Sequence, residues 1–293
     1  MCFKPWMKFD WSLSGGPLQD PLAALGEVKS RAGVCFLALH GGEGENGSIQ
    51  GLLSAAGLAF TGSGVAASAV CMDKQATRTL AADAGVRIAP GRLIAHARID
   101  REGLAALTAL SDSGWVVKPR HGGSSVDTHM LARAEELPGA VQAAFTGGDD
   151  ALCEARVRGV EVSCGVLGNR GEDCRALPPI EIRPRSGRFF DYEEKYSQTG
   201  AEELCPAVSL DAAECERVQA AALRMHALCG CDGYSRADFI VSPAGEPVLL
   251  ELNTLPGLTP RSLLPQEARQ VGLSYEELCL WILAAGLRTE RTR

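Results

Sequence analysis

Three side chains with oxygen donors lie near one another in the last third of the sequence. Asp238 falls within the apolar segment 233–242, and Glu251 and Asn253 directly follow the apolar run "VLL". Residues two apart in a strand point to the same face, so Glu251 and Asn253 would share a face. The turn "PAGE" between the two segments would pair them antiparallel and bring Asp238 to the other two. Oxygen ligands suit a hard cation such as Mg²⁺ or Mn²⁺, which also bridges phosphates.

The same three residues also allow a purely structural interpretation. Asp238 could pair with Arg236 on the surface, and Glu251 could end an edge strand. A carboxylate beside an apolar run is costly unless a cation or a metal ion compensates it. Both interpretations are open from these residues alone.

Several further groups could bind phosphate. Lys118 ends the apolar strand "VVKP", Lys74 follows "CMD" at a helix start, and Lys195 lies in the long polar segment 188–207. A single lysine is most often a solvated surface residue. The run "HGGSSV" at 121–126 offers backbone N–H groups and hydroxyls to phosphate oxygens, although such runs also form linkers. His40 in "HGGEGENG" adjoins a glycine-lined loop, where a lone histidine is usually structural.

Strands, glycine loops and helices alternate along the chain, which indicates an α/β architecture. Residues 151–168 alternate in polarity on both sides of Gly159, as two antiparallel strands would. The other expected elements are an apolar strand from 34, helices over 48–60, 211–231 and 274–286, and strands over 114–119, 233–242 and 247–253.

Composition excludes several classes of protein. The chain has 293 residues, 46% of them hydrophobic and 22% charged, as in globular proteins. A net charge of −7 argues against a nucleic-acid partner. No apolar run is long enough for a membrane helix. The eleven cysteines are scattered and their number is odd, which suggests reduced thiols in a cytoplasmic protein.

Six segments carry a family resemblance. They are "HGGEGENGSIQG" (40–51), "TGSGVAASAVCMDK" (61–74), "VVKPRHGGSSV" (116–126), "FFDYEEKY" (189–196), "GYSRADF" (233–239) and "ELNTLPGLTPRSLLP" (251–265). In order and separation they resemble the D-alanine–D-alanine ligases of the ATP-grasp superfamily. The resemblance implies an ATP-grasp α/β fold with α+β lobes and a shortened N-terminal α/β domain. It implies domains over 1–72, 73–155 and 156–293, the last two being the central and C-terminal ATP-grasp lobes.

The resemblance also implies a two-step reaction for peptidoglycan precursor synthesis. The carboxylate of one D-alanine takes the γ-phosphoryl group of ATP, and the amine of a second D-alanine then displaces phosphate from the acyl phosphate. The cofactors implied are ATP and Mg²⁺ or Mn²⁺, with two ions. Family members often form dimers, so a homodimer is expected.

The family's functional residues can be carried over by position. Asp238, Glu251 and Asn253 resemble the metal ligands, Lys74 and Lys118 the lysines on the ATP phosphates, Glu154 and Val157 the adenine hinge, and Glu161 the ribose contact. Arg236 and the Gly257 N–H resemble the groups on the reacting phosphoryl and the oxyanion, Ser262 and Leu263 the site of the second substrate's carboxylate, Ser124, Lys195 and Tyr196 the closing elements, and His40 a histidine near the first substrate.

Some features depart from the family pattern. A lysine–tyrosine pair in "EKY" resembles ligases that make an amide, either D-Ala-D-Ala or D-Ala-D-Ser. The family's N-terminal glutamate, which holds the first substrate's amine, has no counterpart in residues 1–39, and Asp127 stands where glycine is common. A different amino-acid ligase and a protein that binds ATP and Mg²⁺ without ligating are therefore the alternatives.

Overall fold

The computed structural model describes residues 25, 28–30, 33–95, 100–122, 127–145, 148–184 and 201–289. No helix within these ranges is long and apolar enough to cross a membrane. The helices are α2 (Gly42–Glu45), α3 (Ser48–Ala55), α4 (Val65–Met72), α5 (Lys74–Asp83), α6 (Arg101–Thr108), α7 (Leu137–Ala144), α9 (Ala212–Leu228), α10 (Leu263–Gln270) and α11 (Tyr275–Arg288), with the 3₁₀ turn η1 (Ala134–Glu136). The strands are β1 (Val34–Cys35), β2 (Ala59–Phe60), β3 (Arg87–Ile88), β4 (Gly91–Ile94), β5 (Trp115–Pro119), β6 (His129–Leu131), β7 (Ala151–Ala155), β8 (Val160–Leu167), β9 (Arg175–Ala176), β10 (Ile180–Pro184), β11 (Ala201–Leu204), β12 (Tyr234–Val241) and β13 (Pro247–Asn253).

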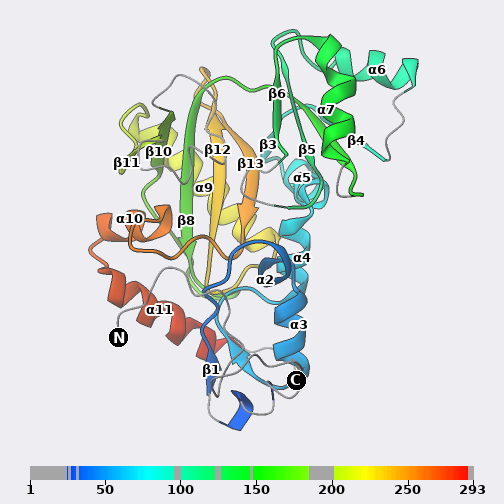
Figure 1. Cartoon of the computed structure of the whole chain (residues 1–293). Coiled ribbons are helices and arrows are strands. Elements are labelled where there is room, and N and C mark those ends of the chain that lie inside the picture. The colour runs from blue at the N-terminus through cyan, green and yellow to red at the C-terminus, as the bar shows by residue number, and fades with distance from the viewer. Residues whose placement is uncertain are drawn as a thin grey trace.

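The largest sheet has seven strands and forms the centre of the molecule (Figure 1). Its order is β11-β10-β8-β12-β13-β3, with β9 paired to β8. All pairs are antiparallel except β13 with β3. The expected pairing of 233–242 with 247–253 is confirmed, because β12 and β13 are antiparallel neighbours.

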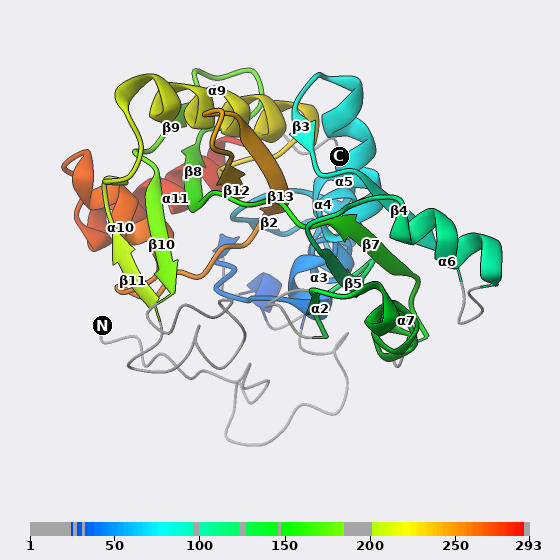
Figure 2. The same ribbon diagram turned by 90° about the horizontal axis from the view of Figure 1, so that it is seen from above.

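One face of this sheet is apolar and lies against α9, as Figure 2 shows from above. Ala237, Phe239 and Val241 of β12 point to that face and pack with the helix. Alternation then directs Arg236 and Asp238 to the opposite face. The functional side chains of β12 are therefore separated from the α9 core by the sheet itself.

A β-bulge re-aims the end of β13. Asp238 pairs with Glu251, but the next residue, Phe239, pairs with Leu249, so Leu250 is the extra residue. Leu249 packs in the α9 core, and simple alternation would direct Glu251 there as well. The bulge turns Glu251 to the face of Asp238 instead, a known use of bulges beside active sites.

A four-stranded antiparallel sheet, β4-β7-β5-β6, forms a second lobe that α6 and α7 cover on one side (Figure 1). Trp115 and Val117 of β5 and Cys153 of β7 belong to the core beneath those helices. Lys118 and Glu154 therefore point to the other face. A third core joins the parallel pair β1-β2 to α3, α10 and α11.

The expected pairing within 151–168 is wrong, although both strands exist. β7 belongs to the four-stranded sheet and β8 to the seven-stranded sheet, so the chain passes from one lobe to the other between them. Gly159 lies in this connection with φ +156°, where a Cβ atom would be 2.0 Å from the Val241 carbonyl oxygen. Alternating polarity identifies a half-buried strand but does not specify its partner.

Asp127 has a left-handed backbone conformation, with φ +57°. This conformation costs a residue with a side chain roughly 1–2 kcal/mol, less for Asp, and costs glycine nothing. We expect Asp127→Gly to raise the free energy of unfolding by about 0.5 kcal/mol, after the greater entropy of unfolded glycine is deducted. Urea denaturation would measure this change. The control is Asp112→Gly, at an exposed position with an ordinary φ, where the free energy of unfolding should not rise. A loss of stability in Asp127→Gly equal to that of the control would contradict the prediction.

His226 of α9 is buried as a neutral imidazole. Its Nε2 donates to the Gly168 carbonyl oxygen at 3.1 Å, which leaves Nδ1 to accept from the Ser235 hydroxyl at 2.7 Å. Burial lowers the pKa of His226 to about 4, below its value of about 6.5 in the unfolded chain. The unfolded chain therefore takes up the proton first as the pH falls from 6.5 to 4, and stability decreases over that range. When the pH is lowered from 7 to 4.5, the free energy of unfolding of the wild type, measured with urea, should fall by about 2 kcal/mol more than that of His226→Gln. An equal fall in the two proteins would contradict this prediction.

Candidate active site

The three predicted metal ligands meet on the face of the large sheet that lies away from α9. Asp238 and Glu251 are direct cross-strand partners. The Asn253 amide nitrogen lies 3.1 Å from Asp238 Oδ2 and 3.3 Å from Glu251 Oε1, so the amide points between the two carboxylates. No three His, Cys, Asp or Glu side chains gather as a metal site in the described ranges. This set instead combines two carboxylates with one amide, and its oxygens suit a hard cation.

Arg236 is paired with Asp238 in this arrangement. Its Nε and Nη2 each donate to one Asp238 oxygen at 2.8 Å. The structural interpretation of an Arg236–Asp238 pair is thus partly confirmed, but the pair is largely buried rather than on the surface. Burial disfavours the charge of Arg236, yet Asp238 outweighs this effect and raises the arginine's pKa above its usual value.

Lys118 and Glu154 form the second group, on the inner face of the four-stranded sheet. Lys118 Nζ lies 2.6 Å from Glu154 Oε2, and both side chains are buried. Arg78 of α5 contacts the other oxygen, Glu154 Oε1, and donates to the Ala89 carbonyl oxygen at 2.7 Å. The expected phosphate lysine and the expected hinge residue are therefore neighbours joined by an ion pair.

Lys74 begins α5 and lies between the two groups. Its Nζ donates to the Gly122 carbonyl oxygen at 2.7 Å, at the start of the predicted phosphate loop. Burial lowers the pKa of Lys74, against the opposing charge of Glu251. Both residues line one small cavity together with Asn253, so the structure brings Lys74 to the expected metal ligands.

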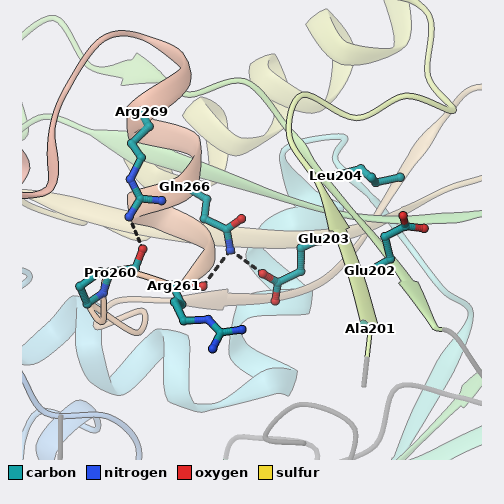
Figure 3. A pocket seen from close by; sticks show the side chains of 8 residues that line it. All are labelled: Ala201, Glu202, Glu203, Leu204, Pro260, Arg261, Gln266 and Arg269. Atoms are coloured by element: carbon teal, nitrogen blue, oxygen red, sulfur yellow. Dashed lines mark hydrogen bonds between the residues drawn. The ribbon is translucent and has the colours of Figure 1, made fainter. Parts of the chain in front are cut away.

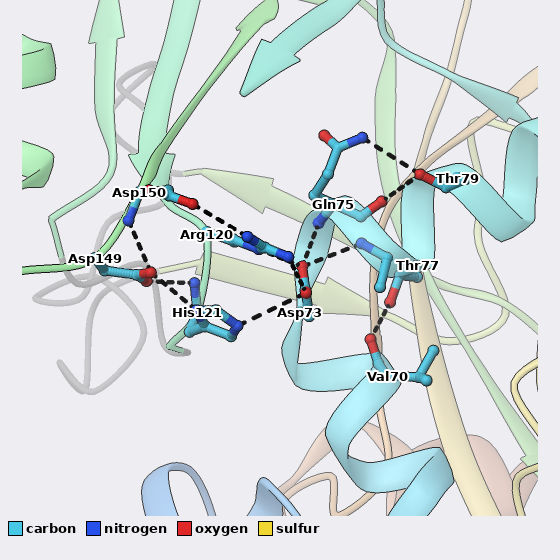
Figure 4. A network of polar contacts seen from close by, with 10 residues as sticks. Val70, Asp73, Gln75, Thr77, Thr79, Arg120, His121, Asp149 and Asp150 are labelled. Carbon is cyan, nitrogen blue, oxygen red and sulfur yellow. Dashed lines mark hydrogen bonds and ion pairs between the residues drawn. The ribbon is translucent and has the colours of Figure 1, made fainter. Parts of the chain in front are cut away.

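A network of charges fixes the start of α5 to the end of β5 (Figure 4). Asp73 caps α5 by accepting from the Gln75 and Ala76 N–H groups, and it also accepts two bonds from Arg120, at 2.9 and 2.6 Å. Burial raises the pKa of Asp73, but Arg120 outweighs it and holds the pKa below its usual value. Arg120 also contacts Asp150 at 3.1 Å. These bonds set the position of Lys74 relative to the segment that follows β5.

The glycine-rich segment after His40 docks on the turn that follows β13. His40 Nδ1 lies 3.2 Å from the Leu255 carbonyl oxygen. Glu45, which is buried, accepts from the N–H groups of Gly41 at 2.9 Å and Leu255 at 3.3 Å. Leu255 lies two residues beyond Asn253. This contact therefore holds His40, the histidine expected near the first substrate, close to the metal ligands.

The residues expected to hold the second substrate lie at the start of α10. Ser262 is the N-cap position, its hydroxyl contacts Thr259 Oγ1 at 2.9 Å, and Leu263 is the first helical residue. A Cβ atom at Gly257 would lie 2.9 Å from Ser262 Oγ, so the turn and the helix start are in close contact. These three predicted residues are brought together.

A polar groove of ≈ 510 Å³ adjoins this helix start (Figure 3). In it Gln266 contacts the Glu203 carboxylate of β11 and donates to the Arg261 carbonyl oxygen at 2.7 Å, while Arg269 contacts Pro260. These bonds hold the segment 260–261 against α10 and connect it to β11.

Of the remaining predictions, Glu161 lies on β8 opposite Ile240, and Val157 follows β7. Ser124, Lys195 and Tyr196 lie outside the described residues. Sequence reasoning missed Arg78, Glu45 and the Asp73–Arg120 pair. Arg78 had one available signal, because it follows Lys74 by four positions and so shares its helix face.

Comparison with known proteins identifies the family. The model for the D-ala D-ala ligase C-terminus matches residues 80–284. A D-alanine–D-alanine ligase of Leptospira interrogans is 41% identical over 88% of this chain and 74% of its own length. The chain belongs to the D-alanine–D-alanine ligase family. The corresponding ligase of Oleidesulfovibrio alaskensis is 43% identical over 92% of this chain and 85% of its own.

Solved structures agree with this family. The Bacillus anthracis D-alanine–D-alanine ligase complexed with ATP has a TM-score of 0.77 and 28% identity, over 92% of this chain and 84% of that one. The VanG D-Ala:D-Ser ligase of Enterococcus faecalis has the same TM-score and 31% identity, over 87% and 73%. The ATP-grasp fold and the ligase class expected from the sequence are confirmed.

Proposed function

We propose that this chain joins two D-alanines at the expense of ATP, for peptidoglycan precursor synthesis in the cytoplasm. The observation that carries the proposal is the convergence of Asp238, Glu251 and Asn253 beside Arg236 and Lys74. Charge on transferring phosphoryl oxygens needs fixed cations and metal ions around it. The names of the relatives indicate D-alanine as the substrate, and these residues are suited to bind the metal ions and the phosphates.

In this proposal Asp238, Glu251 and Asn253 would hold two ions of Mg²⁺ or Mn²⁺. When bound, such ions would neutralise phosphate charge and polarise the phosphoryl group. The Asn253 amide presents nitrogen to both carboxylates here, and a half-turn of the amide would present its oxygen to a cation instead.

Different residues are assigned to the different parts of ATP. Lys118 and Lys74 bind phosphate oxygens from the inner face of the small lobe and the start of α5. Glu154 and Val157 bind the adenine, and Glu161 binds the ribose. Arg236 and the Gly257 N–H stabilise the reacting phosphoryl group and the oxyanion.

Other residues of the site would bind the amino-acid substrates. His40 adjoins the first D-alanine, and Ser262 and Leu263 hold the carboxylate of the second. Ser124, Lys195 and Tyr196 close the site and exclude water. Because a D-Ala:D-Ser ligase matches the fold as well as a D-Ala–D-Ala ligase does, D-serine is the second candidate for the amine substrate.

Phosphate release and product analysis test this function. Incubation with ATP, Mg²⁺ and D-alanine should release phosphate and yield D-alanyl-D-alanine, identified by mass spectrometry. A mixed dipeptide formed preferentially when D-serine is added would favour the second candidate. ATP binding without dipeptide formation from any D-amino acid would contradict the ligase proposal.

The remaining organisation follows the family. We place the functional lobes at 1–72, 73–155 and 156–293, with the nucleotide between the last two. A homodimer is the proposed assembly, and small molecules rather than nucleic acids or membranes are the proposed partners.

A further inference from the structure

Glu267 is a buried carboxyl group with no role in the site described above. It lies in α10 with 0% exposure, and its Oε2 accepts from the Gly165 N–H at 2.7 Å. Among the described residues its Oε1 has no hydrogen-bond partner. Burial raises the pKa of Glu267 to about 8. A half-satisfied buried acid is costly, so its retention calls for an explanation.

The strand register places Glu267 beside Arg236. Gly165 of β8 is the direct cross-strand partner of Arg236, and directly opposed residues project to the same face. A Cβ atom at Gly165 would lie 2.4 Å from Glu267 Oε2. The carboxyl group therefore occupies the space of the missing side chain, next to the arginine. When it is ionised, Glu267 helps to raise the pKa of Arg236, and the charge of Arg236 in turn opposes the rise in the pKa of Glu267.

Arg236 occupies the Asp238 oxygens that a metal ion would need. Both Asp238 oxygens accept from Arg236, and they also accept from Ser163 Oγ at 2.5 Å and the Asn253 amide at 3.1 Å. A cation bound by Asp238 must displace part of this set. Arg236 would then lose its partner unless another acceptor lies close by.

We propose that Glu267 is a positioning residue for Arg236: its unpartnered oxygen accepts the guanidinium group when Asp238 turns to the metal, and so keeps Arg236 aimed at the phosphoryl group. This inference rests on the proposed metal site. Without the carboxylate, Arg236 stays on Asp238 and opposes metal binding.

The substitution Glu267→Gln would test the positioning of Arg236 separately from the packing of the side chain. Glutamine keeps the shape and an oxygen for the Gly165 N–H but cannot carry charge. We expect Mn²⁺ affinity, in the presence of ADP, to fall about 10-fold, as is typical when a group behind a metal ligand is altered. The turnover number should fall by a similar factor while the KM for D-alanine stays unchanged. The melting temperature should be maintained, because a neutral group suits the buried position.

Electron paramagnetic resonance of unbound Mn²⁺, titrated with protein and ADP, measures the affinity directly. The matched control is Glu172→Gln, which removes an exposed carboxylate paired with Arg288 and should match the wild type. Weaker Mn²⁺ binding in Glu267→Gln alone supports the inference. Equal binding and turnover in Glu267→Gln and wild type would overturn the inference while leaving the proposed function intact. Failure of the wild type itself to bind Mn²⁺ with ADP would overturn the metal site and the inference together.

Discussion

Glu251→Gln should lower the D-alanine-dependent release of phosphate by about 10²–10³-fold. The change removes one of two carboxylates that neutralise the proposed metal, and a loss of about 3–4 kcal/mol in transition-state stabilisation gives that factor. Glutamine retains an oxygen for the Asn253 amide, which contacts Glu251 Oε1 at 3.3 Å, so the fold should persist. Phosphate release at saturating ATP measures the effect.

Two measurements would distinguish the loss of a metal ligand from a loss of the folded structure. The far-ultraviolet circular dichroism and melting temperature of Glu251→Gln should match those of the wild type. Higher Mn²⁺ concentrations should recover part of the lost rate, because the remaining ligands still bind the ion weakly. Full activity of Glu251→Gln at ordinary Mg²⁺ concentrations would show that Glu251 is not a ligand.

Arg78→Met should destabilise the protein by about 1.5–3 kcal/mol, the usual contribution of a buried hydrogen bond to a charged group. Arg78 contacts Glu154 in the interior and also donates to the Ala89 carbonyl oxygen at 2.7 Å. Methionine fills similar space, but among the described residues it leaves Glu154 only Lys118 as a cationic partner, and it leaves the Ala89 carbonyl without the arginine donor. Urea unfolding measures the loss.

Arg87→Met is the matched control for this prediction. Arg87 forms a pair with Glu246 at 3.1 Å, but its side chain is 65% exposed, so its loss should cost less than about 1 kcal/mol. Similar stabilities for the two variants would mean that the Arg78–Glu154 contact contributes no more than a surface pair.

The local part of the site was predictable from the sequence. Asp238, Glu251 and Asn253 lie on strands joined by a short turn, and such strands pair with each other. The bulge at Leu250 was not predictable, because the run "VLL" gives no sign of an extra residue. The sequence therefore predicted that Glu251 and Asn253 share a face, but not how Leu249 and Glu251 come to face opposite sides.

Contacts between segments that are far apart in the chain could not be predicted from the sequence pattern. The strands on either side of Gly159 read as a hairpin, yet each belongs to a different sheet. The sequence likewise contains no sign that Arg78 and Glu267 are buried, because most charged side chains are exposed. Only the packing of α5 and α10 against the sheets shows that they are buried beside Glu154 and Arg236.

Anomalous diffraction from crystals grown with ADP and Mn²⁺ would locate the proposed metal ions. We predict an anomalous peak within coordination distance of Asp238, Glu251 and the Asn253 amide oxygen, with Arg236 turned away from Asp238. A peak bound by other side chains, or bound nucleotide with no manganese at these three residues, would contradict the account.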